Sequence, residues 1–292
     1  MRHILLLLAL CLPGFAAAWG RDGHTMIAAM AESRLTTTTL LKTRAILGGR
    51  PLAAVSVWAD VVRRDRPATA PWHYVNIHIN RDDMSIWDCP NNDCVPMIIS
   101  DHEALLRRGD SLFDDERREV LQYLIHFVGD QAQPLHNANE DDQGGNDKKV
   151  VFFGRETNLH AVWDTGILRH HFSRLSIDGP RLAAELNAEI RPEQIRLWIQ
   201  GTPIDWTNEA HRIAIEFAYP GWWPEMGDAY YEKNIGTVRV QLQKGAIRLA
   251  HVLNRLYDPQ YKGELPVLRA LEFSDEADFP EAGGFQQLRN SN

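Results

Sequence analysis

The sequence LQYLIHFVGDQAQPLH, residues 121–136, carries the strongest structural signal in the chain. His126 and Asp130 are four residues apart, so on a helix they lie on the same face, one turn from each other. Pro134 ends that helix, and His136 follows where the chain must turn. Imidazole and carboxylate groups on one helix wall are typical ligands of transition metals. The stretch therefore predicts a helix that carries part of a metal site.

A second histidine–aspartate pair with the same spacing, His160 and Asp164, follows in the sequence NLHAVWD. One such pair could be structural, because a histidine on an apolar helix face is usually a satisfied core or surface residue. The apolar residues around position 126 indicate a buried helix, in which an aspartate is costly unless it is paired or metal-bound. Two pairs, with His136 between them, favour a multi-metal site.

Length and composition set wide limits on the number of domains and on the class of protein. The chain has 292 residues, 44 % of them hydrophobic, which suffices for one large domain or two small ones. The net charge of −8 argues against a general basic surface that holds nucleic acid. It does not exclude phosphate chemistry, because several divalent ions in one cleft would dominate the local field.

The first 18 residues have the pattern of a signal peptide. A short basic start precedes the apolar run 4–12, and Ala16-Ala17-Ala18 is a small-residue cleavage site. The mature chain is therefore predicted to begin at Trp19 and to be exported, to a periplasm or out of the cell. A free amine on Trp19, with its own carbonyl oxygen, could chelate a metal near His24. The alternative is that Trp19 is simply the first residue of the core.

Two cysteines, Cys89 and Cys94, remain after removal of the signal peptide, within DCPNNDC. In an exported chain they predict one disulfide that closes a tight loop. They could instead bind a metal, but their spacing matches no closed zinc site.

The pattern of the mature chain is mainly helical, and strand signals are scarce. Helices are predicted over 25–35, 36–47, 51–64, 95–108, 115–127, 159–171 and 236–256, and a short strand over 150–153. Asp60 and Arg63 lie near one face of the third helix, where they could also form an ordinary ion pair. Residues 71–80 are predicted to be extended, with His78 in a structural role. The polar residues 137–149 predict a surface loop, and 258–292 an acidic tail in which 265–271 is expected to pack.

Together these residues resemble the zinc-dependent single-strand-specific nucleases, the type I or S1/P1 family. The resemblance rests on WGRDGH (19–24), VWAD (57–60), WHYVN (72–76), HFVGDQAQPLH (126–136), GGND (144–147), NLHAVWD (158–164) and, more loosely, GAIRLAHVLN (245–254). It implies one all-α domain over 19–257, of the phospholipase C and single-strand nuclease type, with few short strands around a trinuclear zinc cluster.

The resemblance also implies roles for single residues. The ligands would be Asp60, His73, His126 and Asp130 for one zinc, the Trp19 amine and carbonyl with His24 and Asp130 for a second, and His136, His160 and Asp164 for the third. A hydroxide that bridges two zinc ions would attack phosphorus, and Arg63 would stabilise the phosphoryl oxygens. Tyr74 would stack on a base, with Asn76, Asn146 and Asp147 as further substrate contacts. The family often has Asp where this chain has Asn76, so the base preference is expected to differ.

The implied activity is that of an endonuclease and 3′-nucleotidase, which hydrolyses phosphodiester bonds of single-stranded DNA and RNA to products with 5′-phosphates and also takes 3′-nucleotides as substrates. The protein is expected to be a monomer with no stable protein partner and no membrane association. The closest alternative is a zinc-dependent phospholipase C, which tends to carry Glu where this chain has Asp164. A non-catalytic exported zinc-binding protein is a third reading.

Overall fold

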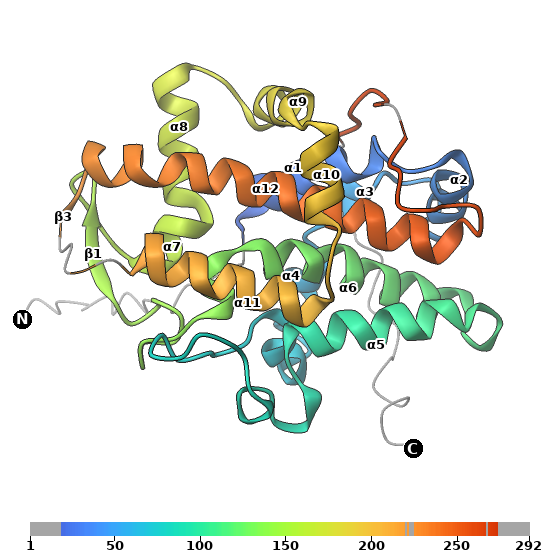
Figure 1. Ribbon diagram of the computed structural model, residues 1–292, viewed down its shortest axis with the longest axis horizontal. Helices are drawn as coiled ribbons and strands as arrows, with labels where there is room; N and C mark the ends of the chain where they lie inside the picture. Colours follow the sequence, from blue (N-terminus) through green and yellow to red (C-terminus); the bar gives the residue numbers. More distant parts are fainter. Residues whose placement is uncertain (1–18, 220, 222–224, 267, 274–292) are drawn as a thin grey trace, which may run out of the picture.

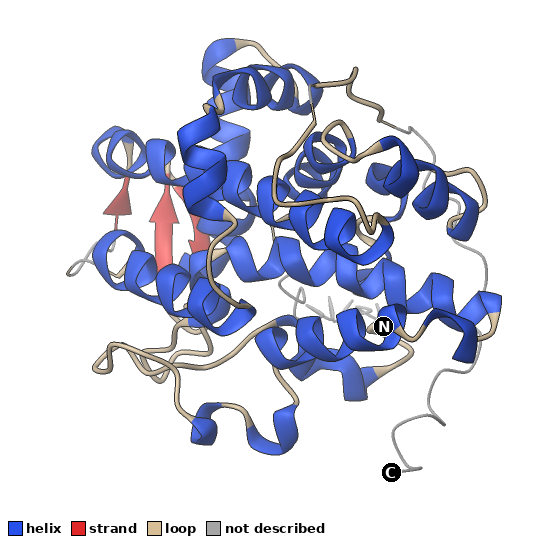
Figure 2. Ribbon diagram, turned by 45° about the vertical axis from the view of Figure 1, so that its right-hand side comes forward, coloured by secondary structure: helices blue, strands red, loops and turns tan. Residues whose placement is uncertain are grey.

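A computed structural model gives the fold, and it describes residues 19–219, 221, 225–266 and 268–273. The predicted signal peptide, 1–18, lies outside the described residues, as does the acidic end of the predicted tail, 274–292. The described chain is mainly helical, as the sequence predicted, with one small sheet at its side (Figure 2). None of the described helices combines the length and the apolar character needed to cross a bilayer.

The element boundaries follow the chain in order. The α-helices are α1 (Arg21–Glu32), α2 (Thr37–Ile46), α3 (Leu52–Val55), α4 (Trp58–Val62), α5 (Val95–Arg107), α6 (Asp114–Ala132), α7 (Leu159–Ala161), α8 (Ile167–Leu175), α9 (Gly179–Glu189), α10 (Pro192–Trp198), α11 (Pro203–Ile213) and α12 (Asp228–Tyr257). Short 3-10 helices are η1 (Pro67–His73), η2 (Ile86–Asp88), η3 (Pro90–Asn92), η4 (Gly109–Ser111) and η5 (Pro134–Asn137). Two π turns are η6 (Val162–Gly166) and η7 (Ala214–Ala218).

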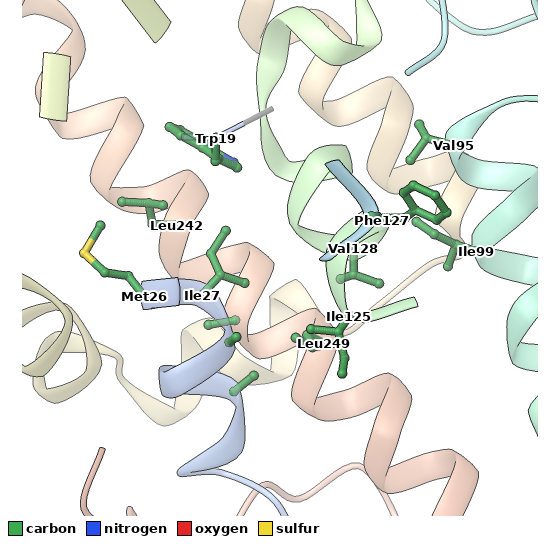
Figure 3. Packing of buried hydrophobic residues seen from close by; sticks show 14 of the residues in the cluster. Trp19, Met26, Ile27, Val95, Ile99, Ile125, Phe127, Val128, Leu242 and Leu249 are labelled. Atoms are coloured by element: carbon green, nitrogen blue, oxygen red, sulfur yellow. The ribbon is translucent and has the colours of Figure 1, made fainter. Parts of the chain in front are cut away.

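Helices α6 and α12 pack against each other and against α1 through the middle of the molecule (Figure 1). Figure 3 shows buried apolar side chains of these three helices at close range, among them Ile27, Val128 and Leu249. Gly245 of α12 allows the close approach, because a Cβ there would lie 3.1 Å from Ile27 and 3.2 Å from Ala132. Full burial of such a side chain contributes about 1.5–3 kcal/mol, so this packing fixes the position of α6.

The sheet has three strands, β1 (Lys149–Phe152), β2 (Arg155–Asn158) and β3 (Glu225–Met226), in the order β2-β1-β3. β1 is antiparallel to β2, with Val150 opposite Thr157, and parallel to β3, with Phe152 opposite Met226. The predicted strand at 150–153 is therefore confirmed as β1, while β2 and β3 were not predicted. The sheet leads directly into α7, which carries His160.

Several predicted boundaries were wrong. α12 begins at Asp228 and not at 236, and residues 71–73, predicted to be extended, belong to η1. α1 begins at Arg21, four residues before the predicted start, so His24 lies inside the helix and not ahead of it. The predicted helix 51–64 is divided into α3 and α4 at Ser56 and Val57. The break has a use, because the Ser56 carbonyl accepts a hydrogen bond of 2.7 Å from the His126 imidazole.

The loop 137–149 also differs from its prediction as a surface loop. Asn137, Asp142, Gly144 and Gly145 in it are buried. Several of its polar groups are hydrogen-bonded within the protein, so polarity did not force them into solvent. The predicted packing of the tail is confirmed, since Leu265 and Leu271 contact the core.

The predicted disulfide is present between Cys89 and Cys94, whose Cα atoms are 5.5 Å apart. It lies between the extended segment that begins at Tyr74 and the start of α5. A backbone hydrogen bond of 3.1 Å from Val95 to the Tyr74 carbonyl ties the two ends of this region together.

Candidate metal centre

Three groups of histidine and aspartate side chains bring possible ligand atoms within 4.8 Å of one another. They are His24 with His126 and Asp130, Asp60 with His73 and His126, and His136 with His160 and Asp164. All eight residues were predicted as metal ligands from the sequence. The third group has the composition that the resemblance implies, and His126 belongs to both of the others.

Asp130 links the first two groups, and its carboxylate is fully buried. One oxygen lies 3.2 Å from His24 Nε2, and the other lies 2.9 Å from His73 Nδ1 and 3.2 Å from His126 Nε2. Asp60 Oδ1 is 3.8 Å from His73 Nδ1 and 3.7 Å from His126 Nε2. Two carboxylates therefore face three imidazoles that come from α1, η1 and α6.

Backbone carbonyls orient three of the imidazoles. His126 Nδ1 lies 2.7 Å from the Ser56 oxygen, His136 Nδ1 2.7 Å from the His73 oxygen, and His160 Nδ1 2.7 Å from the Gly144 oxygen. A carbonyl can only accept, so each Nδ1 carries a proton, and Nε2 is the nitrogen left to bind a metal. Fixing the tautomer in this way is how proteins prepare a histidine for a metal.

Several buried ligand atoms have no hydrogen-bond partner among the described residues. They are Asp60 Oδ1, His136 Nε2, and the two atoms His24 Nε2 and Asp130 Oδ1, which lie 3.2 Å apart without hydrogen-bond geometry. A buried polar atom left unpaired is costly, and a bound cation would remove that cost. The donor set of imidazole nitrogens and carboxylate oxygens therefore fits metal ions such as zinc.

Asp164 of the third group lies in the π turn η6, between α7 and α8. A single π turn within a helix often marks a functional site. Its Oδ1 accepts a 2.6 Å hydrogen bond from Gln133 Nε2, and its Oδ2 lies 3.3 Å from His160 Nε2. Gln133 thus fixes the carboxylate with one oxygen toward the histidine.

Arg63 lies at the edge of these groups. Its Nη2 is 3.6 Å from Asp60 Oδ1, and its side chain is 15 % exposed. Burial raises the pKa of Asp164 in the third group well above its usual range, and the positive charge of Arg63 opposes this effect. Arg63 therefore lies beside Asp60 of the second group and acts on the third through its charge, while part of its side chain remains accessible.

The predicted substrate residues lie on two neighbouring segments. Tyr74 and Asn76 are exposed and alternate with the buried Val75, as expected for an extended chain. Val75 donates a 2.8 Å backbone hydrogen bond to the His136 carbonyl, so this segment runs beside the third group. Asn146 is half-buried and Asp147 exposed in the loop 137–149.

Trp19 is fully buried, and the next residue, Gly20, donates a 2.9 Å backbone hydrogen bond to the Asp164 carbonyl. The start of the described chain thus lies against η6. The role of Trp19 as a ligand stays a prediction. His78 lies outside the three groups and pairs with Asn139 in an isolated bridge, in keeping with a structural role.

Burial dominates the protonation of the histidines in the metal-free protein. Burial lowers the pKa of His24 and of His73. It also lowers the pKa of His136 to about 3 and the pKa of His160 to about 4. His126 is the exception. Burial again favours its neutral form, but the charges of Asp130 and Asp60 raise its pKa to about 9.

These shifts predict that acid destabilises the metal-free protein. Four of the five imidazoles bind protons more readily when the chain is unfolded, so unfolding takes up protons as the pH falls below 6.5. The free energy of unfolding should therefore decrease between about pH 6.5 and pH 4, and His126 opposes this only in part. Denaturant midpoints of chelator-treated protein at about pH 7 and pH 5 test the sign, and a higher midpoint at the lower pH would contradict it.

Gly129 provides a second prediction. A Cβ at this position of α6 would lie 2.8 Å from His24 Nδ1, and that ring stacks on His126 with 4.0 Å between centroids. Gly129→Ala should therefore displace His24 and weaken metal binding roughly 10- to 100-fold, although alanine favours a helix. The control is Gly236→Ala in α12, where a Cβ meets nothing within 4 Å. It should keep full metal binding and gain about 0.5–1 kcal/mol of stability. Equal metal affinity of the two variants would refute the prediction.

Sequence reasoning missed the groups that hold the ligands. Gln133, the Ser56 carbonyl and the Gly144 carbonyl orient Asp164, His126 and His160 respectively. The only sequence signal for Gln133 is its position just before Pro134 and His136. Carbonyl groups have no signal of their own, because every residue has one.

Comparisons with known proteins place the chain in a family. A family model described as S1/P1 Nuclease matches residues 19–258. Endonuclease 4 of Arabidopsis thaliana is 29 % identical over 277 residues, which cover 85 % of this chain and 92 % of that protein. Nuclease P1 of Penicillium citrinum is 27 % identical over 272 residues, 82 % and 98 % of the two chains. Nuclease S1 of Aspergillus oryzae is 28 % identical over 189 residues, 62 % and 65 %.

The family match covers most of the chain, so the protein belongs to the S1/P1 nuclease family. It is accordingly a hydrolase, a nuclease that cleaves phosphodiester bonds of nucleic acids. Its buried histidine and aspartate groups are the part of the structure able to bind metal ions.

Proposed function

We propose that this nuclease depends on zinc and holds three zinc ions, one at each group. The observation that carries the proposal is the set of buried imidazoles and carboxylates whose free lone pairs face one another. The proposed ligands are Asp60, His73, His126 and Asp130 for the first ion, Trp19, His24 and Asp130 for the second, and His136, His160 and Asp164 for the third. Imidazole and carboxylate ligands suit zinc well.

The proposed reactions are hydrolysis of phosphodiester bonds within single-stranded DNA and RNA, which leaves the phosphate on the 5′ end of the product, and release of the phosphate from 3′-nucleotides. Bound zinc would supply Lewis acidity and lower the pKa of a water molecule. The Arg63 guanidinium would donate hydrogen bonds to the phosphoryl oxygens as negative charge develops on them. Asp60 and Asp130 would hold the ions at the point of reaction.

Tyr74 supports the preference for single strands. Its ring is 37 % exposed and follows directly after the buried ligand His73. An aromatic ring in this position can stack on any base, provided that the base has left its own stack. Asn76 faces the same side of the extended segment, and its amide can both donate to and accept from a base edge. Asn146 and Asp147 of the GGND loop are proposed as further contacts.

We also propose that the protein is exported and matures by cleavage after Ala18, so that the nuclease domain begins at Trp19. The disulfide between Cys89 and Cys94 supports an oxidising compartment. The domain would then act as a monomer on soluble substrates.

The test combines metal and product analysis of the purified mature protein. Elemental analysis should give about three zinc ions per chain, matching the three ligand groups. A short single-stranded oligonucleotide should yield fragments with 5′-phosphate and free 3′-hydroxyl ends. One zinc ion or none, or 3′-phosphate ends, would contradict the proposal. Turnover of phosphatidylcholine without cleavage of DNA would favour the phospholipase alternative.

A further inference from the structure

The loop that orients His160 is organised around a buried carboxylate with no assigned role. Asp142 is only 8 % exposed, although the neighbouring Glu140 and Asp141 are exposed. Its Oδ1 accepts a 3.1 Å hydrogen bond from the Glu140 amide and a 2.9 Å hydrogen bond from the Gly145 amide. We call residues 139–147 the glycine loop. Asp142 therefore closes this loop from within.

A tyrosine from a distant part of the chain completes the arrangement. The Tyr219 hydroxyl donates a 2.9 Å hydrogen bond to the same Asp142 oxygen. Tyr219 follows the π turn η7 and is 7 % exposed. Burial, followed by the charge of Asp142, raises its pKa, so the hydroxyl keeps its proton. The Lys148 ammonium lies 5.1 Å from the centre of the ring.

The glycine loop in turn holds His160 at two points. The Gly144 carbonyl accepts from His160 Nδ1 at 2.7 Å, and the Gly145 carbonyl accepts from the His160 amide at 3.2 Å. Gly144 has a φ of +65°, and a Cβ there would lie 2.7 Å from the Leu135 carbonyl oxygen. The loop thus has little freedom to adjust. A shift of Gly145 would move both carbonyls and turn the imidazole of His160.

We propose that Tyr219 is a positioning residue for the third metal group. Through Asp142 and the glycine loop it holds His160 so that Nε2 faces Asp164. The inference rests on the proposed function, in which His136, His160 and Asp164 bind a zinc ion. It is selective, because His126 is oriented by Ser56 and His136 by His73, without the glycine loop.

Tyr219→Phe tests this proposal, because it removes only the hydroxyl. Zinc would be withdrawn from the holoenzyme by increasing concentrations of a chelator and measured with a chromogenic indicator. His160→Ala lacks one ligand of the third group. The step of zinc release that changes in this variant is therefore the one that belongs to the ion of the third group. In Tyr219→Phe this ion should leave at a chelator concentration roughly tenfold lower than in the wild type, and the other ions at the same concentration.

The matched control is Tyr231→Phe. Tyr231 is also a buried tyrosine, and its hydroxyl lies 2.7 Å from His171 Nδ1, away from the glycine loop. The Tyr231→Phe variant should release its zinc ions at the same chelator concentrations as the wild type. Asp142→Asn is the second variant. This variant keeps an acceptor for the Tyr219 hydroxyl but loses the negative charge. The chelator concentration that releases its third zinc ion should therefore lie between the values for the wild type and for Tyr219→Phe. It serves as the test if Tyr219→Phe does not fold.

The outcomes distinguish a failure of the positioning role of Tyr219 from a failure of the proposed zinc-dependent function. If the wild type holds three zinc ions and Tyr219→Phe releases them as the wild type does, the positioning role is wrong and the proposed function stands. If all ions leave Tyr219→Phe more easily to the same extent, the tyrosine is merely structural and the role is also wrong. If the wild type holds no zinc at the third group, the proposed function itself fails, and the positioning role fails with it.

Discussion

Asp130→Asn is expected to abolish nuclease activity and to remove the metal from two of the three groups. The carboxylate lies within 3.2 Å of nitrogen atoms of His24, His73 and His126, so one substitution affects all three imidazoles of both groups. Burial alone would favour the protonated acid, but the charge of His126 and the hydrogen bonds from the imidazoles hold the pKa of Asp130 well below its usual range. The ionised carboxylate is therefore the form on which the centre depends.

The asparagine variant keeps the shape of the side chain but loses the negative charge that two cations would share. Activity should fall by more than about a thousandfold, beyond the effect of a single lost donor. The zinc content should fall from about three ions to about one, which remains with His136, His160 and Asp164. Asp115→Asn at the exposed start of the same helix is the control and should change stability by less than about 0.5 kcal/mol. Full zinc content in Asp130→Asn would show that Asp130 is not a shared ligand.

Arg63→Ala is the second substitution with a large expected effect. It should lower kcat about 10²- to 10³-fold, because it removes a donor aimed at charge that develops in the transition state. Zinc content should not change, since Arg63 contacts Asp60 only at 3.6 Å and is not a metal ligand. Arg63→Lys should be intermediate, because lysine keeps the charge and loses the planar pair of donors.

The neighbouring Arg64 provides the matched control, since it has the same chemistry and is exposed to solvent. Arg64→Ala should keep kcat within about twofold of the wild type. The assay is turnover of a short single-stranded oligonucleotide at saturating concentration, with zinc measured in the same sample. A loss of zinc in Arg63→Ala that matches the loss of activity would assign this arginine to the stability of the centre and not to the reaction.

The sequence was most informative where a regular pattern and a chemical requirement coincide. In α6 the apolar flanks predicted a buried helix, and the spacing of His126 and Asp130 predicted that both face the same way; the structure agrees on both points. The third group is similar, because His160 and Asp164 again lie four residues apart. Ligands from separate elements, such as His24 and His73, were found through the resemblance and not through spacing.

What could not be predicted depends on backbone geometry. The π turn at Asp164 and the break after Ser56 follow from how the helices must meet, and short segments carry little signal of either kind. The glycine loop was predicted to lie at the surface because it is polar. Several of its polar groups are instead hydrogen-bonded to Asp142, Asn139 and Tyr219, and Tyr219 lies 77 residues from Asp142 in the chain. A contact of that separation has no local signature.

The interruption between α3 and α4 limits how far this enzyme can be made more robust. An uninterrupted helix across Ser56 and Val57 would satisfy more backbone groups, and residues with high helix propensity would favour it. The same change would redirect the Ser56 carbonyl into the helix and away from His126, which needs that oxygen to present Nε2 to the ions. A substitution at Ser56 or Val57 that raises thermal stability should therefore lower the rate of turnover. A search for heat-resistant variants should leave these two residues unchanged.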